Sequence, residues 1–275
     1  MMSNFKDQVA LITGASSGIG AALAQELARE GANVVLLARR AERLEAIASQ
    51  IDPNGQRVLA IPCDVTKDGE LDQAASFARS KFGKIDIVVA NAGWSLKGNV
   101  ENLRVNDYRR LWETNVFGVL STIYATLDDL KKTKGRLVII SSVKSYVALS
   151  GDSPYSMSKF AMRALCESLS QELAPHGVSV THICPGYVAT EIRQLDNQGI
   201  WHSDWEDPIS PRLMISAEET AQQIVKAISR RQREQVITNY GKLIVLIKRH
   251  MPWLLSLLIS KFKIKVAAKP SPIQQ

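Results

Sequence analysis

The chain has 275 residues, 45% hydrophobic and 22% charged, with no low-complexity tract and no internal repeat, which excludes a disordered or fibrous protein. Its net charge is +7, but the excess is confined to the tail: seven of the 34 Lys and Arg and none of the 27 Asp and Glu lie from Gly241 onward. The pI near 9.3 therefore gives no support to a nucleic-acid-binding protein, because the remaining residues are formally neutral.

The cysteines and histidines favour a reducing compartment and no metal. The three cysteines are an odd number without metal-ligand spacing, and we expect free buried thiols at Cys63, Cys166 and Cys184. The four histidines form no ligand-like cluster: His176, His182, His202 and His250. Residues 1–7 are polar and lead directly into an apolar run, so no signal peptide is expected. These features predict a cytoplasmic protein.

Short β-branched runs alternate with helical stretches along residues 1–240. The predicted strands are 8–13, 33–38, 57–62, 85–90, 136–141, 178–184 and a weaker 235–238. The predicted helices, which carry apolar residues at spacings of three and four, are 20–30, 41–50, 70–82, 106–131, 155–174 and 217–230. This order predicts an α/β fold: one Rossmann-type domain with a doubly wound, parallel, seven-stranded sheet and helices on both faces.

Three segments interrupt this alternation: 94–105, 187–215 and the tail 241–275. In such folds ligands bind beyond the carboxyl ends of the strands, where long irregular segments tend to carry function. Residues 187–215 are therefore predicted to form a substrate lid.

A glycine-rich turn follows the first predicted strand, where glycines let the backbone approach a pyrophosphate that the next helix N-terminus stabilises. Such a turn alone is also found as an ordinary tight turn, but its place between a first strand and a first helix favours dinucleotide binding. The residues expected to contact the dinucleotide are Gly14, Ser16, Ser17, Gly18, Ile19 and Gly20.

The second predicted strand ends in Arg39 and Arg40, at the place where an NAD-binding chain usually carries an acid for the ribose hydroxyls. Guanidinium groups suit a 2′-phosphate because their planar donors pair with phosphate oxygens. NADP(H) is therefore the predicted cofactor. Arg39 is the preferred phosphate ligand, and Arg40 is either a second ligand or a solvated residue at the helix start.

With these motifs the chain resembles the short-chain dehydrogenase/reductase family over about residues 6–240. The resemblance rests on the TGxxxGIG turn from Thr13 to Gly20, on Asn91-Ala92-Gly93 after the fourth strand, and on Tyr155-x-x-x-Lys159 after the fifth. It implies further cofactor contacts: Asp64 and Val65 at the adenine, Asn91, Ala92 and Gly93 along the adenosine ribose, Pro185 and Gly186 against the nicotinamide, and Val188 and Thr190 near its carboxamide. Alternatively, each Gly or Pro in this set is only a residue of an ordinary turn.

Tyr155 and Lys159 are four residues apart near the start of a helix, so they share one face. An ammonium near the phenol is expected to bring its pKa from about 10 towards neutral pH, which would make Tyr155 an acid or base. Ser142 ends the fifth strand, where its hydroxyl can donate to a substrate oxygen, and Ser141 is the expected structural hydroxyl. By resemblance Ser142 is the family serine, and Tyr155 and Lys159 also contact the cofactor.

Asn115 lies in the middle of a predicted helix, where asparagine is intrinsically unfavourable. It resembles the family asparagine that helps to hold a water joining Lys159 to solvent, and it also reads as a polar residue that distorts the helix. The predicted catalytic set is Asn115, Ser142, Tyr155 and Lys159, with no departure from the family pattern and no metal.

The predicted reaction is the NADPH-dependent reduction of a carbonyl group, a ketone or aldehyde, to an alcohol. Pocket candidates are Trp94, Val143, Tyr146, Tyr187 and residues 200–205, and their aromatic side chains suggest a hydrophobic, lipid-like substrate or else pack the loop on its own domain. Two alternatives stay open: an alcohol dehydrogenase working in the oxidative direction, and a non-catalytic NADP(H)-binding regulatory protein.

The tail is strongly apolar, but basic residues and Pro252 break it into runs shorter than the roughly 20 residues that span a bilayer. We expect amphipathic helices that either make peripheral contact with an anionic membrane through residues 242–265, or cover the substrate pocket or a subunit interface. The family resemblance also implies a homo-oligomer, a dimer or tetramer.

Overall fold

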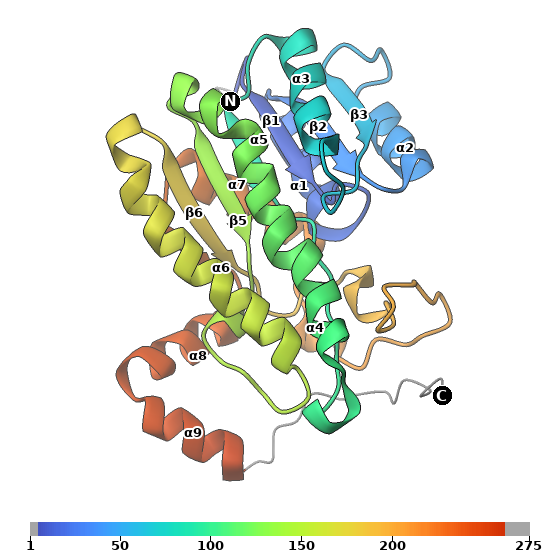
Figure 1. Cartoon of the computed structure of the whole chain (residues 1–275). Coiled ribbons are helices and arrows are strands. Elements are labelled where there is room, and N and C mark those ends of the chain that lie inside the picture. Colours follow the sequence, from blue (N-terminus) through green and yellow to red (C-terminus); the bar gives the residue numbers. More distant parts are fainter. Residues whose placement is uncertain (1–4, 262–275) are drawn as a thin grey trace.

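The computed structural model describes residues 5–261, and these form a parallel seven-stranded sheet in the order β3-β2-β1-β4-β5-β6-β7 (Figure 1). The strands are β1 Val9–Thr13, β2 Asn33–Ala38, β3 Val58–Pro62, β4 Ile87–Ala90, β5 Arg136–Ile140, β6 Ser179–Cys184 and β7 Glu234–Val236. The predicted fold class is confirmed. The strand order reverses between β1 and β4, which opens a crevice at the carboxyl ends of these strands.

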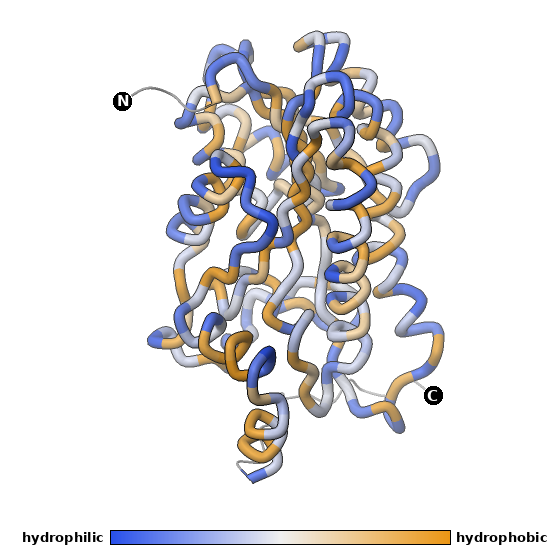
Figure 2. Tube along the Cα trace, turned by 90° about the vertical axis from the view of Figure 1, so that its left-hand side faces the viewer, coloured by the Kyte–Doolittle hydropathy of each residue, from blue (hydrophilic) through white to orange (hydrophobic). Residues whose placement is uncertain are grey.

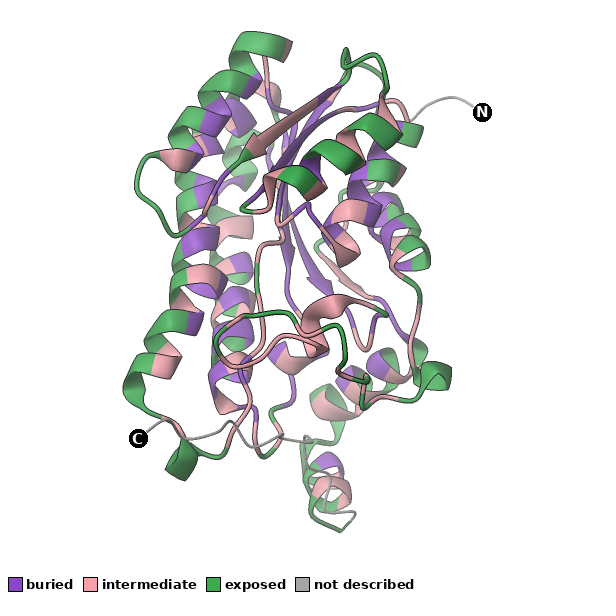
Figure 3. Cartoon of the chain, turned by 90° about the vertical axis from the view of Figure 1, so that its right-hand side faces the viewer, coloured by how far each residue is buried: buried purple, intermediate pink, exposed green. Residues whose placement is uncertain are grey.

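Helices cover both faces of the sheet (Figures 1 and 3). One face packs against α1 Gly18–Arg29, α2 Ala41–Ile51 and α7 Ala217–Ser229. The other packs against α3 Glu70–Phe82, α5 Gly118–Thr133 and α6 Ser153–Glu172, with α4 Val105–Trp112 leading into α5. Strands β1 and β4 are buried at every residue, because a parallel sheet between two helix layers exposes neither face.

The prediction of one continuous α-helix over 106–131 is wrong. The structure divides it into α4 and α5, joined by a π-helix over Glu113–Phe117. The buried Asn115 carboxamide lies in this wide turn and bonds both backbone groups of Trp94: Trp94 N donates to Oδ1 at 3.0 Å, and Nδ2 donates to Trp94 O at 2.9 Å. A polar side chain committed to a distant backbone explains the local departure from α-helix.

The described part of the tail forms two helices, α8 Asn239–His250 and α9 Pro252–Lys261, at one end of the molecule (Figures 1 and 2). Pro252 begins the second helix, where its missing N–H and fixed φ are tolerated. Val245 and Leu255 are buried in a small separate core with Val143 and Cys184. Within residues 5–261 no helix is long and apolar enough to cross a membrane, and residues 262–265 of the predicted membrane contact lie outside the described residues.

Candidate active site

A cavity of about 1340 Å³ opens at the carboxyl ends of β1, β4, β5 and β6. It exceeds the roughly 300–1,000 Å³ of a single small-molecule site, so a dinucleotide and a second compound fit together. Its lining includes the glycine-rich turn, Ser142 and Tyr155, part of the lid segment and side chains of the tail helices.

The glycine-rich turn is shaped for close backbone approach. A Cβ on Gly14, whose φ is +66°, would lie 2.8 Å from Ala92 Cα, and a Cβ on Gly20 would lie 2.4 Å from Gly14 O. Gly20 does not line the cavity and serves helix–strand packing, whereas Gly14, Gly18 and Ile19 line it with the two serines of the turn. The N-terminus of α1 thus meets the cavity, an arrangement that fits a pyrophosphate.

Arg39 and Arg40 both line the cavity but differ in their contacts. Arg39 is exposed. Arg40 donates to Ser16 Oγ at 3.0 Å and to Ser17 Oγ at 2.8 Å, and it pairs with Glu191 Oε2 at 3.2 Å. Arg40 is the N-cap residue of α2 and stays partly exposed, as one alternative expected, but its guanidinium also braces the glycine-rich turn and joins it to the lid segment.

Asn91, Ala92 and Gly93 follow β4 along the cavity wall. Asn91 Nδ2 donates to Thr13 O at 2.9 Å and to Gly14 O at 3.2 Å, so this side chain holds the glycine-rich turn in place. Thr13 Oγ1 in return accepts from the backbone of Asn91 and Ala92.

The remaining predicted cofactor residues follow β3 and β6. Val65 lines the cavity, whereas Asp64 is not among the lining residues and its carboxylate accepts from Thr66 N at 3.0 Å. The four predicted cofactor residues in the segment after β6 all line the cavity: Pro185, Gly186, Val188 and Thr190. A Cβ on Gly186 would lie 2.3 Å from Thr238 Oγ1 and from the Tyr240 hydroxyl, so only glycine lets α8 pack there.

Ser142 and Tyr155 both line the cavity, and the Ser142 hydroxyl donates to Pro185 O at 3.5 Å. Ser142 ends the extended chain after β5, and its hydroxyl also accepts from Lys144 N at 3.1 Å. Burial raises the pKa of Tyr155 to about 12, against the smaller lowering effects of the Ser142 hydrogen bond and the Arg193 charge. The expected net shift of this pKa towards neutral pH is wrong, because desolvation outweighs the nearby charges.

Lys159 lies one turn along α6, with Nζ 5.5 Å from the centre of the Tyr155 ring. Its Nζ donates to Ile140 O at 3.1 Å, and Ser141 Oγ donates to the Lys159 carbonyl at 3.4 Å. Burial lowers the pKa of this ammonium to about 8. Asn115 Nδ2 donates to Ser158 Oγ at 3.2 Å, so the π-helix touches α6 at the residue next to Lys159.

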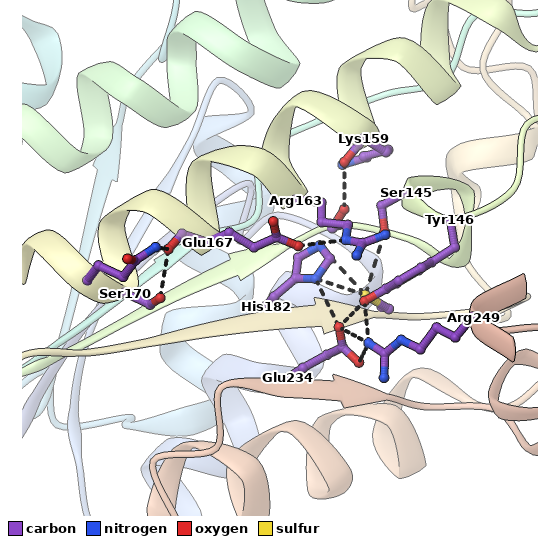
Figure 4. Close-up of polar contacts among 12 residues, drawn as sticks. Ser145, Tyr146, Lys159, Arg163, Glu167, Ser170, His182, Glu234 and Arg249 are labelled. Atoms are coloured by element: carbon purple, nitrogen blue, oxygen red, sulfur yellow. Dashed lines mark hydrogen bonds and ion pairs between the residues drawn. The ribbon is translucent and has the colours of Figure 1, made fainter. Parts of the chain in front are cut away.

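A polar cluster, buried at Tyr146 and His182 and partly exposed at its other members, lies behind these residues between β6, β7, α6 and α8 (Figure 4), and we call it the buried cluster. Tyr146 donates to Glu234, and Arg249 of α8 donates to Glu234 Oε1 at 2.7 Å and to the Tyr146 hydroxyl at 2.9 Å. The guanidinium of Arg163 lies over the Tyr146 ring, with its Cζ 4.2 Å from the ring centre. Burial lowers the pKa of His182 in this cluster to about 4. The cluster ties the first tail helix to the turn that carries Ser142.

The predicted pocket residues are only partly brought together. Trp94, Val143, Tyr187 and Trp201 line the cavity. Tyr146 instead belongs to the buried cluster, and Trp205 stacks on His202 at 4.3 Å and braces the lid segment. The sequence left open whether the tail covers the pocket, and it did not predict which side chains of the two tail helices line the cavity. These are Tyr240, Leu243, Ile244, Ile247, Leu255, Leu258 and Ile259. Their helical spacing was the available signal.

Over the described residues, no three His, Cys, Asp or Glu gather as metal ligands would.

Comparison with known proteins agrees with this geometry. The family model for short chain dehydrogenases matches residues 8–201. An uncharacterised oxidoreductase of Staphylococcus aureus (strain MW2) is 36% identical over 192 residues, which is 70% of this chain and 82% of the relative. The chain is a short-chain dehydrogenase/reductase. As a member of this family it is an oxidoreductase that uses a nicotinamide dinucleotide.

Solved structures of this short-chain dehydrogenase/reductase fold extend the likeness beyond the family match. An alcohol dehydrogenase of Thermococcus sibiricus, complexed with 5-hydroxy-NADP, has a TM-score of 0.72 at 30% identity and covers 83% of this chain and 95% of its own. A short chain dehydrogenase/reductase of Burkholderia phymatum, in complex with NAD, has a TM-score of 0.80 and covers 98% of this chain and 99% of its own. The second is 22% identical and shows the fold alone.

Proposed function

We propose that this short-chain dehydrogenase/reductase uses NADPH to reduce a ketone or aldehyde group on an apolar molecule to an alcohol. The observation that carries the proposal is that the hydroxyls of Ser142 and Tyr155 line a cavity with one wall of aliphatic side chains from the tail helices. A carbonyl oxygen can accept from both hydroxyls while the rest of the compound contacts that wall.

In this mechanism Ser142 orients the carbonyl oxygen and stabilises the charge that develops on it. Tyr155 gives its proton to that oxygen. The bound cofactor supplies the hydride. A phenol whose pKa is raised to about 12 keeps its proton at neutral pH, which is the form that a reduction needs. Lys159, next to the ring on the same helix, stabilises the phenolate left behind.

The preference for NADPH over NADH rests on the two arginines after β2. Arg39 is exposed at the cavity edge and presents a guanidinium for a 2′-phosphate, while Arg40 already holds the turn that receives the pyrophosphate. The Thermococcus alcohol dehydrogenase, similar to this chain at 30% identity, was solved with an NADP derivative.

The apolar nature of the substrate rests on the tail helices and the lid segment. Ile244 and Ile247 of α8 and Leu258 and Ile259 of α9 line the cavity. Each methylene of the substrate that is buried against these side chains stabilises the complex by about 0.8 kcal/mol. Selectivity is therefore expected to rise with chain length or ring size.

The test is NADPH oxidation by the purified protein with ketones and aldehydes graded in size, and with Tyr155→Phe as the control. Loss of general-acid catalysis is expected to lower kcat by about 10²–10⁴ while NADPH still binds. Turnover that rises with substrate hydrophobicity and falls in the variant supports the proposal. Equal turnover in the variant, or NADPH binding without turnover of any carbonyl, contradicts it and favours a regulatory protein. If the protein oxidises the matching alcohols much faster than it reduces the carbonyls at neutral pH, the result contradicts the proposed direction and favours an alcohol dehydrogenase.

A further inference from the structure

The tail helices carry exposed apolar side chains that do not line the cavity. These are Leu246, Met251, Trp253 and Leu257, and we call these four residues the tail face. Exposed large apolar side chains gathered on one short helical unit differ from the single exposed ones that any protein carries, and they mark an interaction surface.

The sequence of α9 separates its two sides. Trp253, Leu257 and Lys261 follow one another at intervals of four and share the exposed side, whereas Leu255, Leu258 and Ile259 line the cavity. The helix is therefore apolar almost all round. Burial inside the protein accounts for the inner side and leaves Trp253 and Leu257 largely exposed.

The Lys and Arg side chains of the tail helices have no acid among them. Lys242 and Lys261 are exposed on α8 and α9, and the sequence from Gly241 onward contains no acid. Arg249 is engaged by Glu234 and is not counted with them. A surface that combines exposed Trp and Leu with Lys and no acid complements an anionic lipid surface, where apolar side chains enter the acyl boundary and cations meet phosphate.

We propose that the tail face docks this protein on the surface of an anionic membrane, with α8 and α9 lying in the interface. The described helices are too short to span a bilayer, which limits the contact to the surface. A second copy of this chain is the less favourable occupant. A two-fold interface through the tail face would bring its lysines together with those of the other copy, with no acid on either tail to offset them. The proposal does not depend on the proposed function.

Vesicle sedimentation of the full-length protein tests it. We expect the protein to pellet with vesicles of phosphatidylcholine and phosphatidylglycerol, and to pellet less with phosphatidylcholine alone or at high salt. Trp253→Ser combined with Leu257→Ser should weaken the apparent affinity at least about tenfold, because two large apolar side chains no longer leave water. Lys242→Gln with Lys261→Gln should reduce both binding and its salt dependence.

A matched control removes equally exposed side chains elsewhere. Leu257 and Phe77 are each 57% exposed, and Trp253 and Tyr124 are 67% and 75% exposed. Phe77→Ser with Tyr124→Ser should bind vesicles as the wild type does, and thermal melting of each variant checks the fold. The proposal is overturned if the wild type stays in the supernatant with anionic vesicles, if the tail-face variant binds equally well, or if that variant converts a dimer to a monomer without changing lipid binding.

Discussion

Tyr155 and Lys159 are displaced from their ordinary pKa values in opposite directions by the same cause. Burial disfavours the charged form of each, so it raises the pKa of the phenol to about 12 and lowers that of the ammonium to about 8. The protein thus holds a protonated phenol beside a cation that burial makes costly.

Lys159→Met is expected to abolish turnover and to stabilise the fold at neutral pH. The folded-state pKa of about 8 lies below the ordinary 10.5, so burying the ammonium costs its full free energy below pH 8. That cost disappears as the pH rises towards 10.5, because the unfolded chain then also loses the proton. The difference in unfolding free energy between variant and wild type, measured by urea denaturation, should therefore shrink from about pH 7 to about pH 10. A difference that is independent of pH would contradict this assignment.

Arg39→Ala and Arg40→Ala are expected to separate two roles. Removing Arg39 should weaken NADPH binding by about 1.5–3 kcal/mol, the value of a hydrogen bond to a charged group, and leave NADH binding nearly unchanged. Removing Arg40 should weaken both cofactors, because Ser16 and Ser17 lose the guanidinium that braces the turn. Fluorescence titration of each variant with both cofactors measures the difference, with the exposed Arg29→Ala as the control. Equal loss for both cofactors in Arg39→Ala would remove the basis for the NADPH preference.

Among the elements, α8 has an unusual position because its two sides serve different parts of the site. Ile244 and Ile247 line the cavity, and Arg249 reaches Glu234 of β7 and Tyr146, four residues after Ser142. The helix therefore connects the apolar end of the cavity with the turn that carries Ser142.

Arg249→Leu is expected to loosen α8. The pair with Glu234 is partly exposed, so its loss should cost about 1 kcal/mol, or about 2–4 °C in Tm. Limited proteolysis should cut the tail helices faster in the variant, and the KM for an apolar carbonyl should rise more than kcat falls. Arg29→Leu removes an exposed ion pair with Glu26 on α1 and should change none of these measurements. If proteolysis of the tail is unchanged in Arg249→Leu, the buried cluster does not hold α8 in place.

At the scale of the whole molecule, one cavity is lined both by the glycine-rich turn and by apolar side chains of the tail helices. If the proposed function holds, a chain that ends at Thr238 should keep the proposed preference for NADPH and lose the proposed preference for long apolar substrates, with a KM for them at least about tenfold higher. It should also lose stability, because Val143 and Cys184 lose Val245 and Leu255 as partners. Steady-state kinetics with short and long ketones provides the measurement. Unchanged selectivity by chain length would mean that the tail takes no part in substrate binding.

Particular elements show how far the sequence could be read. All seven strands lie within one or two residues of their predicted positions, because continuous apolar runs between helices leave a buried parallel sheet as their one compact arrangement. The π-helix at Asn115 was not predictable as such, since its cause is the backbone of Trp94, 21 residues away. The same holds for Arg40, whose partner Glu191 lies 151 residues along the chain, and for Tyr146, which points to Glu234 and away from the cavity.

The sequence by itself determined the strand and helix order, the glycine-rich turn and the serine, tyrosine and lysine proposed for the reaction, because these depend on local spacing and on residue chemistry. Tertiary structure decided the direction of the Tyr155 pKa shift, the division of labour between Arg39 and Arg40, and the lining of the cavity by the tail helices. These depend on which distant groups exclude water from one another, and desolvation and long-range packing have no signature in local spacing.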